Sequence, residues 1–302
     1  MRIASLLPSA TEIVCSLGME EELVAVTHEC DYPESVRAKP VLTRSVLSGM
    51  GSSGQIDRHI RELVHQGSSI YALDAGLLAA LHPDLILTQE LCEVCAVSYP
   101  IVERAARRLG SSPQLVSLEP ESLEDVFQNI LFVGRLVGRH DAAEKVCDSL
   151  RRRIATVEQR VAGRPRPTVL CLEWVDPPFN CGHWTPELVS IAGGDELLGV
   201  AHQPAHAVDW QLVIDADPQV VVVMACGFSL DRSLREVDAA RGRFDALRAD
   251  TWVVDGNALF SRPGPRLVDS VEIMAGILHP GVVDPPLPSM ARRLGRISAP
   301  QS

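Results

Sequence analysis

Short apolar runs alternate with helix-type patterns along the first 118 residues. The runs are rich in Val, Ile and Leu, which is typical of buried strands, and they occupy residues 3–6, 23–26, 69–72, 84–88 and 115–118. The first helical pattern contains Ser9 and Glu12 at capping-box spacing and ends at Gly18. Because strands alternate with helices, the pattern predicts a parallel, doubly wound α/β sheet.

Two helical patterns follow each other in the middle of the chain without a strand between them. They cover residues 122–138 and 141–163, and the second has one apolar stripe with residues at steps of three and four. A helix of about 20 residues is roughly 30 Å long. This helix is therefore long enough to run beside two adjoining domains.

The α/β alternation resumes after Pro167. We expect strands at residues 168–174, 219–225, 251–254 and 258–260, and a last helix at 267–278. The pattern predicts two α/β lobes, each with a doubly wound parallel sheet, joined by a long helix. The boundaries are a first lobe at 1–120, linking helices at 121–164, a second lobe at 165–285, and a loosely ordered tail at 286–302.

Length, charge and hydropathy narrow the class of function. The 302 residues suggest about two domains, since single cores stop growing at roughly 250–300 residues. The formal net charge of -11 argues against a nucleic-acid partner, which would need clustered Lys and Arg. No apolar run reaches the roughly 20 residues that span a bilayer.

The beginning of the chain bears on location. Met1 and Arg2 lead directly into the first strand, without the charged and apolar regions of an export signal. As written, the sequence predicts a cytoplasmic protein. The alternative is an extracytoplasmic protein whose leader was removed and replaced by a new Met.

Eight cysteines are spread over the chain, and in a chain this long an even number does not imply a disulfide framework. Cys15, Cys147 and Cys171 fall inside predicted helices or a strand, where they are expected to be small buried hydrophobes. The other five fall on loops that follow strands. Of these, Cys92 and Cys95 form a CxxC, which can supply half of a zinc site, act as a redox dithiol, or be a turn with two semi-buried thiols.

Three segments together resemble a known family. SLLPSATEIVCSLGMEEELVAVTHECDYP, LHPDLILTQELCEVCAV and SRPGPRLVDSVEIMAGIL resemble the cobalamin-binding branch of the periplasmic binding proteins with a helical backbone, the class III solute-binding proteins. The resemblance runs from Arg2 to about Pro280. It implies two lobes with a ligand held between them, a corrinoid or related metal chelate as that ligand, and an ABC permease as partner.

The same resemblance nominates loops at the carboxyl ends of strands as the ligand site, in agreement with the general rule for open α/β sheets. The ligand-binding candidates are Pro8, Ser9, His28, Glu29, Asp31, Gln89, Trp174, Trp184, Phe228, Arg262 and Arg266. The indoles of Trp174 and Trp184 either form flat walls for a macrocycle or pack in the core. Arg262 and Arg266 either clamp polar groups on the rim of the ligand or form surface salt bridges.

Reactive side chains gather on the same predicted loops. The candidate metal ligands are Cys30, Cys92, Cys95, Cys181, His183 and Cys226. They would hold a zinc ion, which thiolates and imidazoles bind at about 2.0–2.3 Å, or they would contact the metal of a corrinoid ligand. No other cofactor is indicated.

Two functions remain open from the sequence. The first is a solute-binding protein without catalytic activity. The second is a cytoplasmic Cys/His metal-binding protein, or a metal- or thiol-dependent enzyme on the same fold. The chain has no nucleophile elbow, P-loop, GxGxxG or HExxH to supply a reaction class, which favours the first.

Overall fold

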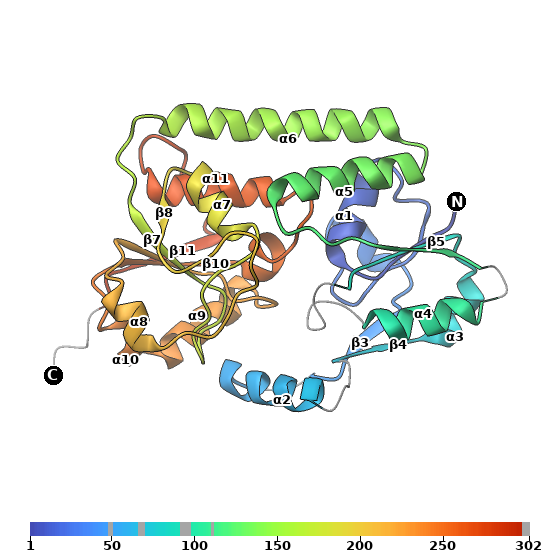
Figure 1. Ribbon diagram of the computed structural model, residues 1–302, viewed down its shortest axis with the longest axis horizontal. Helices are drawn as coiled ribbons and strands as arrows, with labels where there is room; N and C mark the ends of the chain where they lie inside the picture. The colour runs from blue at the N-terminus through green and yellow to red at the C-terminus, as the bar shows by residue number, and fades with distance from the viewer. Residues whose placement is uncertain (48–50, 66–69, 91–97, 110–111, 298–302) are drawn as a thin grey trace. The chain divides into compact units, whose positions relative to one another are not determined.

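The computed structural model describes all residues except 48–50, 66–69, 91–97, 110–111 and 298–302 (Figure 1). The contacts within the chain divide it into two units. The first unit comprises Met1–Gly51, Gln55–Pro120 and Glu124–Asp148; the second comprises Ser52–Gly54, Glu121–Leu123 and Ser149–Ser302. Each unit has an apolar core cluster of its own.

A four-stranded parallel sheet forms the centre of the first unit, in the order β2-β1-β5-β6. Its strands are β1 (Ile3–Ser5), β2 (Leu23–Ala25), β5 (Leu85–Thr88) and β6 (Gln114–Ser117). The helices beside them in the sequence are α1 (Pro8–Ser16), η1 (Glu34–Ala38), α2 (Ser53–His65), α3 (Ala75–Leu81) and α4 (Tyr99–Arg107). Every residue of β5 is buried, because a parallel strand in the middle of a covered sheet has no solvent face.

Two predictions for the first unit need correction. The run at 69–72 was expected in the parallel sheet, but its residues 71 and 72 belong to β4 (Tyr71–Leu73), which pairs antiparallel with β3 (Thr43–Ser45) in a separate two-stranded sheet. The expected cap at Ser9 is also wrong. Helix α1 begins one residue earlier, at Pro8, without a side-chain cap, because a proline at the first helical position needs no partner for an amide hydrogen.

The two consecutive helices of the middle segment are confirmed as α5 (Leu123–Leu136) and α6 (His140–Val161). Gly138, with φ of 69°, makes the left-handed turn between them. A Cβ on Gly134 would collide with the side chain of Ala143, so this glycine allows α5 and α6 to approach closely. Helix α6 is continuous over 22 residues; its beginning belongs to the first unit and the remainder to the second.

A five-stranded sheet forms the centre of the second unit, in the order β11-β10-β9-β7-β8. Its strands are β7 (Thr168–Leu172), β8 (Asp195–Glu196), β9 (Val220–Val223), β10 (Asp250–Val254) and β11 (Ala291–Gly295). Its helices are α7 (Thr185–Ile191), α8 (Trp210–Asp215), α9 (Leu230–Ala239), α10 (Arg241–Phe244) and α11 (Leu267–Leu278). All strand pairs except β10–β11 are parallel, and the α/β fold class with two parallel sheets is confirmed.

The second unit also departs from two expectations. Residues 258–260 are not a strand; they belong to a π-helical turn, η2 (Gly256–Phe260), whose start is capped by the Asp255 carboxylate accepting the N–H of Ala258 at 2.7 Å. Part of the segment expected to be a loose tail forms β11. Arg293 donates from Nε to the carboxylate of Asp250 at 3.0 Å, and this ion pair joins the edge strand to β10.

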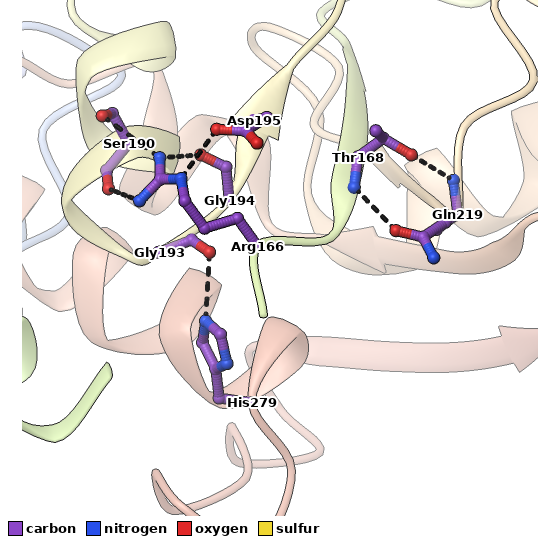
Figure 2. A network of polar contacts seen from close by, with 8 residues as sticks. All are labelled: Arg166, Thr168, Ser190, Gly193, Gly194, Asp195, Gln219 and His279. Atoms are coloured by element: carbon purple, nitrogen blue, oxygen red, sulfur yellow. Dashed lines mark hydrogen bonds and ion pairs between the residues drawn. The ribbon is translucent and has the colours of Figure 1, made fainter. Parts of the chain in front are cut away.

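Polar contacts close the end of helix α7 on the sheet (Figure 2). The guanidinium of Arg166 donates to the carbonyls of Ser190 and Gly194 and to the Asp195 carboxylate, the last at 2.7 Å. His279 Nε2 lies 3.2 Å from the Gly193 carbonyl. The last carbonyls of a helix have no partners inside it, so Arg166 and His279 supply partners at this end of α7. The Ser190 carbonyl also accepts the N–H of Gly193 at 3.1 Å.

Arg153 joins helix α6 to helix α11 within the second unit. It donates to both oxygens of Glu272 at 2.8 and 2.6 Å, and also to Asp269 at 2.5 Å. Hydrogen bonds to these two carboxylates raise the pKa of the guanidinium.

Among helices in the described part of the chain, none is both long and apolar enough to cross a bilayer.

Arg153→Met should lower the free energy of unfolding by about 1–2 kcal/mol, because two half-buried carboxylates lose their shared cation. Arg152→Met, at a neighbouring exposed position, is the control and should change it by less than about 0.5 kcal/mol. Urea unfolding followed by circular dichroism measures both. Equal effects would show that the Arg153 ion pairs contribute no stability.

Candidate functional site

Strand order in the second unit brings three loops to the same edge of its sheet. Strands β7, β9 and β10 are adjacent and parallel, so the segments that follow them leave the sheet at one end. Trp174 follows β7, Phe228 follows β9, and Arg262 follows β10 and η2. The carboxyl ends of parallel strands are where open α/β sheets bind ligands.

Trp174 and Phe228 form an aromatic pair with a cation on it. Their ring centroids are 4.7 Å apart at an interplanar angle of 48°, and the guanidinium carbon of Arg232 lies 3.8 Å from the centroid of Phe228. Burial lowers the pKa of Arg232. Phe228 is buried, whereas Trp174 is only half-buried and donates its indole N–H to the Asp176 carbonyl at 3.2 Å. The pair therefore presents part of one indole at the edge of the sheet.

Glu173 holds the loop after β7 in place. Its Oε1 accepts the backbone N–H of Gly182 at 3.0 Å and the hydroxyl of Thr185 at 3.4 Å. Its carbonyl accepts the N–H of Cys226, in the loop after β9. One residue thus fixes the return of its own loop and connects it to the neighbouring loop.

His183 lies in the left-handed region of the backbone, with φ of 48°. The amide of His183 donates to the Gln203 carbonyl at 2.7 Å, and its carbonyl accepts the N–H of His202 at 3.0 Å. A Cβ on Gly182 would collide with the backbone of residues 203–205. A non-glycine residue in this region is strained, and such strain persists only where surrounding contacts impose it.

The imidazole of His183 is neutral at pH 7, because burial lowers its pKa from the ordinary value of 6.5. The ring stacks on Trp184, with centroids 5.6 Å apart, and its Nδ1 has no hydrogen-bond partner among the described residues. A buried ring nitrogen without a partner costs about 1–3 kcal/mol, and such groups are concentrated at functional positions. His183 is the strongest functional candidate of the second unit.

Trp184 is buried too deeply to form a wall that a ligand could contact. It is 9% exposed, and its indole N–H donates to the Phe260 carbonyl at 2.9 Å. Its polar atom is therefore used within the protein, and one face of the indole supports the His183 ring. Of the two alternatives that the sequence left open for Trp184, this geometry is that of core packing.

The two arginines after η2 differ in their exposure. Arg262 is buried at 3% exposure, and its carbonyl accepts the N–H of Gly264 at 2.8 Å in the tight Arg-Pro-Gly-Pro turn. Arg266 is half-buried and lies at the N-terminal end of α11. Arg262 is therefore an interior side chain and not a surface one.

The predicted loop after β2, in the first unit, forms a polar group of its own. His28 Nδ1 lies 2.7 Å from the hydroxyl of Thr43, and the two rings of His28 and Tyr71 are 5.5 Å apart. Tyr71 donates its hydroxyl hydrogen to Glu29 at 3.1 Å. Thr43 also lines a cavity of about 450 Å³ beside β3 and β4. The structure thus fixes the orientation of an exposed histidine next to a cavity.

The other first-unit candidates lie in different environments. Ser9 and Gln89 are buried, and Pro8 is half-buried at the start of α1. Asp31 lies 3.9 Å from Arg37 in a loose ion pair. Cys30 is buried, with Sγ at 3.1 Å from the Thr11 hydroxyl and 3.2 Å from that of Thr27.

The predicted metal set is only partly brought together. Within the described residues, the group of three donor side chains close enough to share an ion consists of Cys171, Cys181 and Glu196. Cys181 was predicted as a ligand, but Cys171 was assigned to the core and Glu196 was not considered. His183 and Cys226 are outside this group. Cys92 and Cys95 lie outside the described residues, so the CxxC remains a prediction.

Sequence reasoning also missed Arg232. The available signal was its position four residues after Phe228, at the beginning of an amphipathic helix. For Cys171 the signal was the alternation along β7: Leu170 and Leu172 belong to one core cluster, and Cys171 points to the opposite face of the strand. Contact with Glu196 could not be expected, because a two-residue strand such as β8 has no recognisable pattern.

Comparison with known proteins identifies the family. Residues 3–242 match the family model described as periplasmic binding protein, which is more than half of the chain. The chain belongs to the periplasmic binding protein family. The resemblance noticed in the sequence is thereby confirmed at the level of the family.

Individual relatives agree with this assignment. A vitamin B12-binding protein of Vibrio cholerae is 24% identical over 275 residues, which cover 90% of this chain and 86% of the relative. A periplasmic heme binding protein of Pseudomonas aeruginosa has the same fold, with a TM-score of 0.72, 20% identity and coverage of 97% of both chains. A periplasmic vitamin B12 binding protein of Vibrio cholerae gives a TM-score of 0.65, with 21% identity and coverage of 92% and 96%.

Family membership settles one expectation and leaves another without support. The family and these relatives are binding proteins and not enzymes, in agreement with the expectation from the sequence. The cytoplasmic location expected from the first residues is not supported, since the family model and the two solved structures are those of periplasmic proteins.

Gly182→Ala should destabilise this periplasmic binding protein by about 1–3 kcal/mol, because the added methyl group collides with the backbone of residues 203–205. Gly242→Ala is the control: a Cβ there meets no atom within 4 Å, so stability should stay the same or rise by up to about 1 kcal/mol. Thermal unfolding of both variants measures the difference. Similar melting temperatures would show that the turn before His183 accommodates a methyl group without loss of stability.

Proposed function

We propose that this chain is an extracytoplasmic solute-binding protein for a corrinoid or a closely related metal chelate. The observation that carries the proposal is the match to vitamin B12-binding relatives over nine-tenths of the chain, within a family of binding proteins. In the proposed role the protein holds its ligand unchanged and delivers it to an ABC permease. The protein needs affinity and release, and no catalytic group.

The geometry of the second unit supports a large, partly apolar ligand. Trp174 offers part of an indole face, backed by Phe228 and Arg232, and an indole provides a large apolar area. Ligand pockets combine such apolar surfaces with a few fixed polar groups. Here His183 is the polar group whose position is fixed most firmly, by two backbone hydrogen bonds.

His183 is proposed to contact the ligand directly. A neutral imidazole can donate from one ring nitrogen to an amide of the corrin rim or, as the other tautomer, bind a metal through its lone pair. Burial keeps the ring neutral at pH 7 and therefore leaves both uses available. Protonation below the pKa of the ring would remove the lone pair, so coordination of a metal would weaken in acid.

The first unit is proposed to contribute polar contacts. His28 is the leading candidate, because its ring is exposed and held in one orientation by Thr43. The resemblance to the family also proposes five further contacts in this unit: Pro8, Ser9, Glu29, Asp31 and Gln89. Arg262 and Arg266 are proposed to neutralise or hydrogen-bond polar groups of the ligand, a use for which a planar guanidinium is suited.

Hydroxocobalamin should bind with a stoichiometry of one per chain and be recovered unchanged. Equilibrium dialysis with absorbance detection measures the stoichiometry, and chromatography of the released ligand tests for conversion. Hemin, added as a competitor, tests the related class of ligand, and cobalt(II) chloride is the control for binding of the metal alone. Failure of both chelates to bind, or recovery of a chemically altered corrinoid, would contradict the proposal.

His183→Asn should weaken hydroxocobalamin binding by about tenfold or more, the effect of losing one good polar contact of about 1.4 kcal/mol. Asn tolerates the left-handed backbone region, so the variant keeps the turn while it removes the imidazole. His202→Asn is a matched control, since His202 is exposed and has φ of 61°. Quenching of tryptophan fluorescence gives both affinities, and equal affinities would exclude His183 from the site.

A further inference from the structure

A second group of reactive side chains lies apart from His183, on the other side of strand β7 from its core cluster. Cys171 is in β7, Cys181 is in the loop that returns after β7, and Glu196 ends the neighbouring strand β8. The pairing of Val169 with Glu196 brings the two strands into register. The two sulfur atoms and a carboxylate oxygen of Glu196 all lie within 4.8 Å of one another.

We propose that Cys171, Cys181 and Glu196 form a buried binding site for a thiophilic divalent cation of the zinc type. Metal–sulfur and metal–oxygen bonds of about 2.3 and 2.0–2.2 Å place tetrahedral ligand atoms roughly 3.4–3.8 Å apart. Donor atoms already within 4.8 Å need only small side-chain movements to reach that spacing. Three protein ligands leave the fourth position to a water molecule or another exchangeable ligand.

The backbone orients the carboxylate for this role. Glu196 Oε1 accepts the N–H of Cys171 at 3.1 Å, and Oε2 accepts the N–H groups of Leu198, at 2.7 Å, and of Gly199. Hydrogen bonds that hold a ligating carboxylate are the usual outer support of a metal site. Four lone-pair directions on a carboxylate leave room for a metal beside these three bonds.

Gly199 is required for the closeness of the group. A Cβ at this position would collide with the sulfur of Cys181 and lie 2.9 Å from Glu196 Oε2. Both sulfur atoms belong to residues with no exposed surface. A side chain at residue 199 would therefore occupy the space beside the donors, and the burial of both cysteines is consistent with a site that is filled during folding.

The chemistry of the donors selects the cation. Sulfur ligands favour zinc and other thiophilic metals over magnesium and calcium, which prefer oxygen. When a divalent cation binds, the two thiols each release one proton and become metal-bound thiolates. No redox change is involved. Two thiolates and one carboxylate carry three negative charges, so the site with its divalent cation has a net charge of one negative. The backbone N–H groups that donate to Glu196 stabilise this remaining charge. None of the three donors is among the solute contacts proposed above, so the site can be tested without the solute.

The test uses the full chain with Cys92→Ser and Cys95→Ser, which removes the CxxC as another place for zinc. The protein is reduced with a phosphine, dialysed against Zn²⁺ and gel-filtered, and its zinc is measured by mass spectrometry. We expect one zinc ion per chain. Cobalt(II) substitution should give thiolate-to-cobalt charge-transfer absorption, which reports sulfur ligands directly. Absence of retained zinc in the folded protein would overturn the proposal.

Cys181→Ser and Cys171→Ala, each added to that background, should lose the bound zinc and the charge-transfer band. Cys147→Ser is the matched control, because Cys147 is a buried cysteine outside the group, and this variant should retain both the zinc and the band. Circular dichroism verifies that each variant is folded. Should the cysteine variants fail to fold, Glu196→Gln should weaken zinc binding by at least the roughly 10–100-fold that loss of an outer partner of a ligand causes, because here a direct ligand is changed. Unchanged zinc in any folded ligand variant would place the metal elsewhere and overturn the proposal.

Thiol alkylation distinguishes a metal site from a disulfide. Before reduction, the protein is unfolded in a chelator, which removes any bound metal, and is treated with iodoacetamide with and without a reductant. Alkylation of Cys171 and Cys181 without a reductant is the expected result. Protection that persists in the chelator and disappears only with a reductant would show a Cys171–Cys181 disulfide and would overturn the assignment as a resident metal site.

Discussion

The position of strand β7 between β9 and β8 is the constraint on which both functional regions of the second unit depend. Its pairing with β9, from Val169↔Val220 to Leu172↔Val223, puts the loops that carry Trp174 and Phe228 next to each other. Its pairing with β8 puts Glu196 beside Cys171. Successive side chains of a strand point to opposite faces, so β7 places Leu170 and Leu172 in the core and Cys171 on the other side. The same strand ends at the loop that carries Trp174.

Carboxylates bound to backbone amides stabilise the irregular segments around this strand. Glu173 accepts the N–H of Gly182, and Glu196 accepts those of Cys171, Leu198 and Gly199. A buried amide without a partner costs free energy comparable to a lost hydrogen bond, so loops that leave the sheet need such acceptors. Burial raises the pKa of Glu196, whereas these backbone hydrogen bonds act in the opposite direction and favour its charged form. The same contacts that solve a folding problem therefore place charged oxygen atoms near reactive side chains.

The candidate ligand contacts combine rigidity with unused binding capacity. His183 is held in a strained backbone conformation by residues 202 and 203, and its ring stacks on the buried Trp184. Such an arrangement lets a binding protein fix a polar contact before the ligand arrives, which reduces the entropy lost on binding. Trp174 serves a different purpose, because its half-buried indole can change its packing partner from solvent to ligand with little rearrangement.

Local patterns in the sequence determined the α/β class, the positions of most strands along the chain, the two consecutive helices before Pro167 and the resemblance to the family. These features depend on hydrophobic periodicity and short motifs, which are written in neighbouring residues. Tertiary structure decided that β4 leaves the parallel sheet, that residues 258–260 form a turn, and that Trp184 is buried. It also decided that Cys181 meets Cys171 and Glu196 rather than His183 or Cys226. The physical reason is that contacts between distant residues depend on strand register and loop return, which no local pattern encodes.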